Sequence, residues 1–224
     1  MCGAVRADIH GRLAQHDRAW LGPSWHGHLL SPAGKPARAA LVDWFARGHP
    51  AMVRRRDPGE APGVALCVTL PASRWLACIR FTVERCAIAR LAPPVRLAQV
   101  IPDAPPGWHR PLFELDRSST DAGVPLSVIG PLAWQHITGE PYVSARSSVD
   151  LLLRPRTRLQ LEKVMALLRV REDGEGPRLD GEILLGWDDA VAWRDLAAGR
   201  RRVLVKGIDR EGIVDVARLL SVLR

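Results

Sequence analysis

The sequence is short of several features, and each shortage removes a class of protein from consideration. Its four cysteines form no CxxC pair, so neither a disulfide framework nor a cysteine-rich zinc module is indicated, and we expect reduced, buried thiols. No apolar run is long enough to cross a bilayer, and the N-terminal stretch lacks the apolar centre of a secretory signal. A cytoplasmic protein without membrane contact is therefore expected.

Lysine is also scarce, since only Lys35, Lys163 and Lys206 occur among 32 basic residues and the others are arginines. The net charge of +8 predicts a surface that attracts polyanions, although a GC-rich genome produces the same arginine bias without a functional cause. A nucleic-acid-binding protein is not favoured, because the sequence has no helix-turn-helix, zinc-finger or aromatic RNA-binding pattern. The charge therefore permits a phosphorylated ligand or an acidic protein partner and identifies neither.

Alternating apolar segments predict a mixed α/β protein. The expected strands, each a short apolar run between turn residues, are 50–56, 63–70, 75–83, 125–130, 147–153, 178–185 and 202–208. The expected helices are 36–48, 94–100, 132–139, 157–170, 189–198 and 216–223. Strands that alternate with helices favour an α/β or α+β layer, in which helices flank a mixed sheet.

Five prolines between Leu91 and Gly107 predict a hinge between two domains. We expect a small N-terminal α/β domain with an accessory role at residues 1–90. A catalytic domain is expected at residues 91–224, where the chemistry-bearing motifs lie.

The acidic residue Asp150 is unusual, because it lies in an otherwise apolar strand, SVDLLL. Burying a bare carboxylate is costly, so this residue must be paired, bound to a metal ion or placed at an edge of the sheet. Ser148 lies two residues earlier and therefore points to the same face of the strand.

A second segment, RLDGE, repeats the pattern, with Asp180 and Glu182 two residues apart on one face of another apolar strand. If the two strands are neighbours, these carboxylates join Ser148 and Asp150 in one polar patch. Such a cluster binds a hard cation such as Mg²⁺, and phosphate oxygens complete its shell in phosphoryl or nucleotidyl transfer. Two simpler interpretations stay open: Asp180-Gly181 as a hairpin turn, and Asp150 as a salt-bridged residue of an edge strand.

Taken together, the motifs resemble the holo-acyl-carrier-protein synthases of malonate decarboxylase, which are phosphoribosyl-dephospho-CoA transferases. The matching pieces, spread over almost the whole chain in the family's order, are HDRAWL, PAMVRRR, GPLAWQHITGEPYV, SSVDLLLRP, RLDGE, AVAWRDLAA and VLVK. The resemblance implies a nucleotidyltransferase-like mixed sheet in the catalytic domain.

The resemblance also implies a reaction and its site residues. Such enzymes transfer 2′-(5″-triphosphoribosyl)-3′-dephospho-CoA to a serine of the decarboxylase's acyl-carrier subunit, and pyrophosphate leaves. By that analogy Asp150 and Asp180 hold Mg²⁺, and Ser148 belongs to the catalytic strand. Gly130 allows the backbone to approach the triphosphate closely.

Two positions depart from the family's pattern. Gly130-Pro131 stands where the family has Gly-Ser, and the proline removes both a hydroxyl and a backbone N–H that would face phosphate. Ser148-Val149-Asp150 stands where the family has Asp-x-Asp, so a hydroxyl replaces a carboxylate. Either Glu182 approaches the cation as a third carboxylate, or the enzyme works slowly with one metal ion and arginine side chains neutralise the charge. The alternative is a catalytically degenerate relative that binds carrier protein or nucleotide without efficient transfer.

The remaining candidates each allow two interpretations. Lys206, at the end of the strand VLVK, either neutralises the triphosphate or is a solvated strand end. Arg56, the last residue of a basic run, either grips the CoA-like part of the substrate or belongs to a solvated turn. His26 and His28 have the spacing of two metal ligands on a strand, but a surface loop is favoured because no third ligand lies nearby in the sequence.

Overall fold

The computed structural model describes residues 13–31, 34–71, 78–144, 146–172, 176–187, 189–208 and 210–224. The chain divides into two compact units, and the boundary between them falls between Pro93 and Pro94 in the proline-rich segment. Each unit has its own sheet, so the mixed α/β class that the sequence predicts is confirmed. Among the described residues, no helix combines the length and the apolar character needed to cross a membrane.

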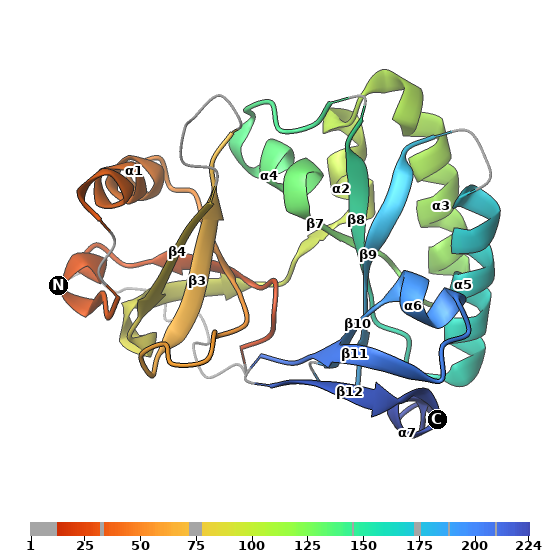
Figure 1. Cartoon of the computed structure of the whole chain (residues 1–224). Helices are drawn as coiled ribbons and strands as arrows, with labels where there is room; N and C mark the ends of the chain where they lie inside the picture. The colour runs from red at the N-terminus through yellow and green to blue at the C-terminus, as the bar shows by residue number, and fades with distance from the viewer. Residues whose placement is uncertain are drawn as a thin grey trace, which may run out of the picture. The chain divides into compact units, whose positions relative to one another are not determined.

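The first unit is built on a five-stranded antiparallel sheet in the order β4-β3-β2-β1-β5 (Figure 1). Its strands are β1 (Arg18–Leu21), β2 (Ala51–Val53), β3 (Val64–Thr69), β4 (Cys78–Val83) and β5 (Ile88–Ala92). Its helical elements are α1 (Lys35–Ala46) and the 3-10 turns η1 (Trp25–His28) and η2 (Arg85–Ala87). The residues of the expected strand 75–83 that precede Cys78 lie outside the described residues.

The second unit contains a seven-stranded sheet in the order β12-β11-β10-β9-β8-β7-β6. Its strands are β6 (Val95–Arg96), β7 (Ser127–Ile129), β8 (Ser148–Leu153), β9 (Arg178–Leu185), β10 (Asp189–Ala192), β11 (Arg202–Lys206) and β12 (Glu211–Asp215). The pair β8 and β9 is parallel, and the other neighbours are antiparallel. The crossover between the parallel strands needs a long connection, and it contains a helix.

Helices of the second unit pack against this sheet. They are α2 (Leu97–Val100), α3 (His109–Asp121), α4 (Gly130–Thr138), α5 (Arg158–Glu172), α6 (Trp193–Ala197) and α7 (Val216–Leu220), with the 3-10 turns η3 (Ile101–Asp103) and η4 (Pro106–Trp108). Figure 1 shows α3 and α5 side by side on one flank of β8 and β9, and the two helices contact each other. Alternate strand residues fill the core beneath them, namely Val149, Leu151, Leu153, Leu179, Ile183 and Leu185.

Three local expectations need correction. The expected helix at 189–198 is a strand, β10, followed by the short helix α6, because residues from Asp189 onward pair with β9 in a ladder that outweighs local helix propensity. The helix α3 was not expected, since only Leu112, Leu115 and Ser119 are buried along its polar sequence. The expected helix starting at Pro94 is divided between the strand β6 and the helix α2.

Candidate active site

The parallel pairing of β8 and β9 aligns the two aspartates that the sequence singles out. The register places Asp150 beside Asp180, Ser148 beside Arg178 and Leu152 beside Glu182. Because neighbouring strands lie about 4.8 Å apart and paired residues of a sheet point to the same side, these polar side chains share one face. The expectation that the two acidic strands are neighbours is confirmed.

Both simpler interpretations of the acidic residues are excluded. Asp180-Gly181 is no hairpin turn, because Gly181 lies inside β9 with a φ of +124°. A Cβ atom on Gly181 would lie 1.9 Å from the carbonyl oxygen of Leu151, so only glycine permits this close approach of β9 to β8. Asp150 is not on an edge strand either, since β8 lies between β7 and β9.

Asp150 is the half-buried carboxylate at the centre of the patch. The Ser148 hydroxyl donates a hydrogen bond to its Oδ1 atom at 3.2 Å. Burial raises the pKa of the Asp150 carboxyl above its ordinary value; the hydrogen bond from Ser148 opposes this rise, and the nearby Asp180 carboxylate adds to it. A divalent cation placed between the two carboxylates would reverse the penalty, because it favours their charged forms.

Gly130 brings the start of α4 against the same carboxylate. It is the first residue of the helix and has a φ of +68°. A Cβ atom at this position would lie 2.1 Å from Oδ2 of Asp150, so any side chain would displace the carboxylate. Pro131 occupies the first turn of α4, where its missing N–H costs the helix nothing but leaves one donor fewer at the helix start.

Two arginines that the sequence reasoning did not select stand beside Asp180. Arg178 Nη2 lies 3.6 Å from Asp180 Oδ2, and Arg194 Nε lies 3.9 Å from Asp180 Oδ1. Arg194 is anchored, because its Nη2 donates to the carbonyl oxygen of Leu179 at 2.6 Å and its guanidinium lies over the Trp193 ring. The only signal for Arg194 was its position in the motif AVAWRDLAA.

The carboxylates of the patch can be compared with the number that a Mg²⁺ ion commonly takes. Among the described residues, only His28, Glu84 and Cys86 form a group of three possible metal ligands whose ligand atoms all lie within 4.8 Å of one another. Glu182 therefore does not form such a group with Asp150 and Asp180. Asp150 and Asp180 remain as a pair on adjacent strands. Mg²⁺ is commonly bound by one or two carboxylates together with substrate phosphates, and this pair supplies that number.

The two basic residues predicted to bind substrate, Lys206 and Arg56, belong to different parts of the chain. Lys206 pairs with Ala190, which pairs with Leu184, so it belongs to the same sheet face two strands beyond β9. Arg56 belongs to the first unit, in the segment after β2.

A cavity of about 600 Å³ opens on the carboxylate face. It is lined by Arg96, Gly123, Pro125, Ser127, Leu152, Arg154, Pro155, Arg156, Gln160, Leu184, Gly186 and Trp187.

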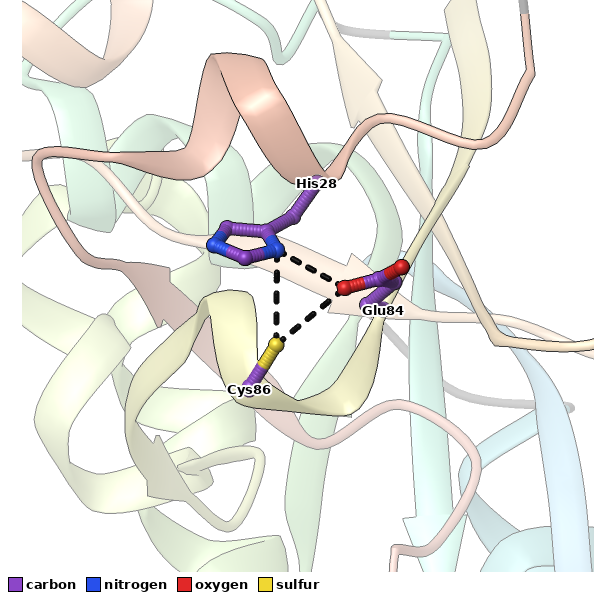
Figure 2. A group of neighbouring side chains, drawn as sticks. All are labelled: His28, Glu84 and Cys86. Carbon is purple, nitrogen blue, oxygen red and sulfur yellow. Dashed lines mark hydrogen bonds and ion pairs between the residues drawn. The ribbon is translucent and has the colours of Figure 1, made fainter.

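A second cluster lies in the first unit. His28 does not act with His26; its Nδ1 atom instead lies 2.8 Å from Glu84 Oε2 and 3.4 Å from Cys86 Sγ (Figure 2). The expectation of buried thiols is wrong for Cys78 and Cys86, which are both exposed. Cys86 sits on the single turn η2, where the backbone leaves its side chain in solvent.

Comparison with family models assigns both parts of the chain. Residues 96–217 match the model described as "Phosphoribosyl-dephospho-CoA transferase MdcG C-terminal domain", and residues 14–94 match the corresponding N-terminal domain. A protein of Xanthomonas campestris pv. campestris named phosphoribosyl-dephospho-CoA transferase is 40% identical over 196 residues, covering 87% of this chain and 91% of its own length. A protein of the same name from Bradyrhizobium diazoefficiens is 33% identical over 208 residues, 92% of each chain. The search of solved structures found no match.

Proposed function

Because the chain belongs to the phosphoribosyl-dephospho-CoA transferase family, we propose that it transfers the phosphoribosyl-dephospho-CoA group to a carrier protein. The donor is 2′-(5″-triphosphoribosyl)-3′-dephospho-CoA, and the acceptor is a serine of the acyl-carrier subunit of malonate decarboxylase. The serine oxygen forms a bond to the phosphorus nearest the ribose, and the bond from that phosphorus to the next phosphate breaks. Pyrophosphate leaves with the bonding electrons.

The observation that carries this proposal is the alignment of Asp150 with Asp180 on adjacent parallel strands. These two carboxylates would hold Mg²⁺, which supplies charge neutralisation at the triphosphate. Glu182 lies one row further along the same face, and we propose that it accepts the proton of the serine hydroxyl.

Positive side chains beside the pair suit the leaving pyrophosphate. Arg178 and Arg194 both approach Asp180 and carry guanidinium groups, which bind phosphate oxygens in a bidentate manner. They compensate for the donors that Pro131 and Ser148 remove from the family's pattern. Lys206, on the same face, adds a further positive charge at longer range.

One observation favours the alternative that the chain is a catalytically degenerate relative, which binds carrier protein or nucleotide without efficient transfer. The Ser148 hydroxyl donates to Asp150 instead of offering the cation a second charged ligand from the same strand. Ser148→Asp would restore that ligand, and we expect it to raise Mg²⁺-dependent transfer several-fold. A protein that binds the carrier tightly in calorimetry, releases no pyrophosphate and gains nothing from Ser148→Asp would be the degenerate relative.

The direct test mixes the purified chain with the carrier subunit, the triphosphoribosyl donor and Mg²⁺. Pyrophosphate release and the mass increase of the carrier are followed together. Asp150→Asn and Asp180→Asn should each lower the rate about a hundredfold or more, because each removes charge stabilisation at the reacting phosphate.

Asp189→Asn is the matched control for these two variants. Asp189 lies on the neighbouring strand β10 beside Leu185, on the face opposite the carboxylate pair, and its carboxylate is bound by Arg210 at 2.6 Å. Its loss should leave the rate within about twofold, since an exposed ion pair contributes little. Equal rates in all three variants would refute the assignment of the site.

A further inference from the structure

The cavity on the carboxylate face begins where the carboxylate pair ends. Leu152 follows Asp150 by two residues on β8, and Leu184 follows Glu182 by two residues on β9, so both point to the carboxylate face. Ser127 pairs with Leu152 and extends this row onto β7. At about 3.3 Å per residue, Leu152 and Ser127 lie one row, or about 7 Å, beyond Asp150, and Leu184 lies two rows, or about 13 Å, beyond Asp180.

The lining of this cavity is positive and contains no acidic residue. Arg96, Arg154 and Arg156 contribute three guanidinium groups. Arg96 is positioned by a hydrogen bond from its Nη1 atom to the carbonyl oxygen of Pro125 at 3.3 Å. The backbone of Arg156 is held on both sides, because its N–H donates to the Gln160 side chain and its carbonyl accepts from Arg224. Such a lining suits phosphate groups.

The same cavity also offers an aromatic surface. Trp187 lines it and is 44% exposed. The prolines at 125 and 155 and the side chains of Leu152 and Leu184 supply apolar walls. A volume of about 600 Å³ is that of a pocket for one nucleotide-sized ligand.

We propose that this cavity binds the adenosine diphosphate part of the donor, while the triphosphate lies at Asp150 and Asp180. The proposal rests on the proposed function, because it assigns one half of that donor. In the donor a single ribose separates the adenosine from the reacting phosphate, which suits a second subsite that begins two residues beyond Asp150 along β8. The arginines bind the diphosphate, and Trp187 stacks against the adenine.

Calorimetric titration separates the two subsites with two probes. The first probe is 3′-dephospho-CoA, which lacks the triphosphate, and the second is inorganic tripolyphosphate with Mg²⁺. Arg154→Gln, Arg156→Gln and Trp187→Leu should each weaken dephospho-CoA binding about tenfold and leave tripolyphosphate binding unchanged. Arg178→Gln, beside Asp180, is the reciprocal control and should weaken only tripolyphosphate. Circular dichroism confirms that each variant is folded.

Two outcomes would overturn this assignment. Dephospho-CoA that binds equally well to the parent and to the three cavity variants does not occupy the cavity. Tripolyphosphate binding that falls in Arg154→Gln would instead place the triphosphate there. Both binding measurements are independent of group transfer. A chain that binds dephospho-CoA as expected but releases no pyrophosphate would contradict the proposed function and still support the adenosine diphosphate subsite.

A separate observation concerns the cluster of His28, Glu84 and Cys86 in the first unit. The three side chains come from two chain segments that are tied by their backbones, since Glu84 N–H donates to the carbonyl oxygen of His28 at 2.9 Å and Leu29 forms a bridge with Val83. Figure 2 shows the imidazole, carboxylate and thiol pointing toward one another. Their ligand atoms all lie within 4.8 Å.

The geometry points to a binding site for a borderline-soft cation such as Zn²⁺. Ordinary zinc–ligand lengths in a tetrahedron place a sulfur about 3.5 Å from nitrogen or oxygen, and nitrogen about 3.3 Å from oxygen. Cys86 Sγ lies 3.4 Å from both His28 Nδ1 and Glu84 Oε2, and the last two atoms lie 2.8 Å apart. A small opening of the His28–Glu84 hydrogen bond therefore completes three corners, and water takes the exposed fourth.

Titration with Zn²⁺, and with Co²⁺ as a spectroscopic probe, tests this site on the full chain. We expect one equivalent to bind, with a thiolate-to-cobalt absorption band, and Cys86→Ser or His28→Ala to weaken binding at least tenfold. Cys78→Ser, which removes the second exposed thiol of the described residues, is the matched control and should change neither readout. No thiolate band in the parent chain, or a band that survives Cys86→Ser, would show that these residues form only a hydrogen-bonded pair beside a thiol.

Discussion

Gly130→Ala tests whether the start of α4 and the Asp150 carboxylate form one unit. Alanine at a φ of +68° costs about 1–2 kcal/mol in backbone conformation alone. Its Cβ atom would also lie 2.1 Å from Asp150 Oδ2, so the carboxylate must turn away and loses the hydrogen bond from Ser148. A hydrogen bond to a charged group adds about 1.5–3 kcal/mol, so the total loss of unfolding free energy is about 2.5–5 kcal/mol.

The other end of the same helix provides the control for this substitution. Gly139 has a φ of +71°, and a Cβ atom there would meet nothing within 4 Å. Gly139→Ala should therefore show only the conformational cost, about 1–2 kcal/mol. The difference between the two variants isolates the contact between Gly130 and Asp150.

Urea denaturation measures the stability of both variants, and Mg²⁺-dependent pyrophosphate release measures their activity. Gly130→Ala should lose about a hundredfold in rate, because a displacement of about 1 Å at a reacting centre has that effect. Gly139→Ala should stay within about twofold of the parent. Equal destabilisation with equal activity in the two variants would refute the coupling of α4 to the carboxylate.

Three further predictions address the surroundings of the pair. Burial raises the pKa of Asp150, so its contribution to stability is present below about pH 3.8 and is lost as the pH rises through the raised pKa. Without Mg²⁺, the melting temperature of Asp150→Asn should therefore be a few degrees above that of the parent at pH 7.5. Differential scanning calorimetry should show that this difference in melting temperature decreases toward pH 4. Gly181→Ala should destabilise by about 3 kcal/mol or more in urea, because its Cβ atom meets the backbone of Leu151. Arg194→Gln should lower the pyrophosphate-release rate about tenfold or more, whereas Arg210→Gln, which breaks the exposed pair with Asp189, should not.

The sequence predicted an element correctly where its local residue pattern favours the same secondary structure as its tertiary contacts. The strand at 178–185 has the predicted bounds, because its apolar residues and its flanking polar turns mark both ends. The helix α4 ends before Gly139, which adopts the left-handed conformation expected of a helix-closing glycine. In both cases the information lies within a few neighbouring residues.

Elements and residues that depend on distant partners were not predictable in this way. Only the long-range ladder with β9 shows that the segment from Asp189 is a strand. The cavity arginines carried no signal, because 32 basic residues spread over the chain make any single one unremarkable. The contact between His28 and Cys86 joins segments 58 residues apart in the chain, and neither segment has a sequence pattern that predicts this contact.

Ser148 and Gly130 act on the two oxygens of the same carboxylate, that of Asp150. Ser148 donates to Oδ1 of Asp150, and Gly130, which precedes Pro131, packs against Oδ2. Asp150 on β8 and Asp180 on β9 together carry the negative charge that balances one divalent cation, and Glu182 lies one row further along β9. The charge that a second ion would neutralise must then be met by Arg178 and Arg194, which approach Asp180 from its two oxygens. We therefore propose a one-ion site with flanking arginines, an arrangement in which the altered motif could still support transfer of a phosphate-linked group.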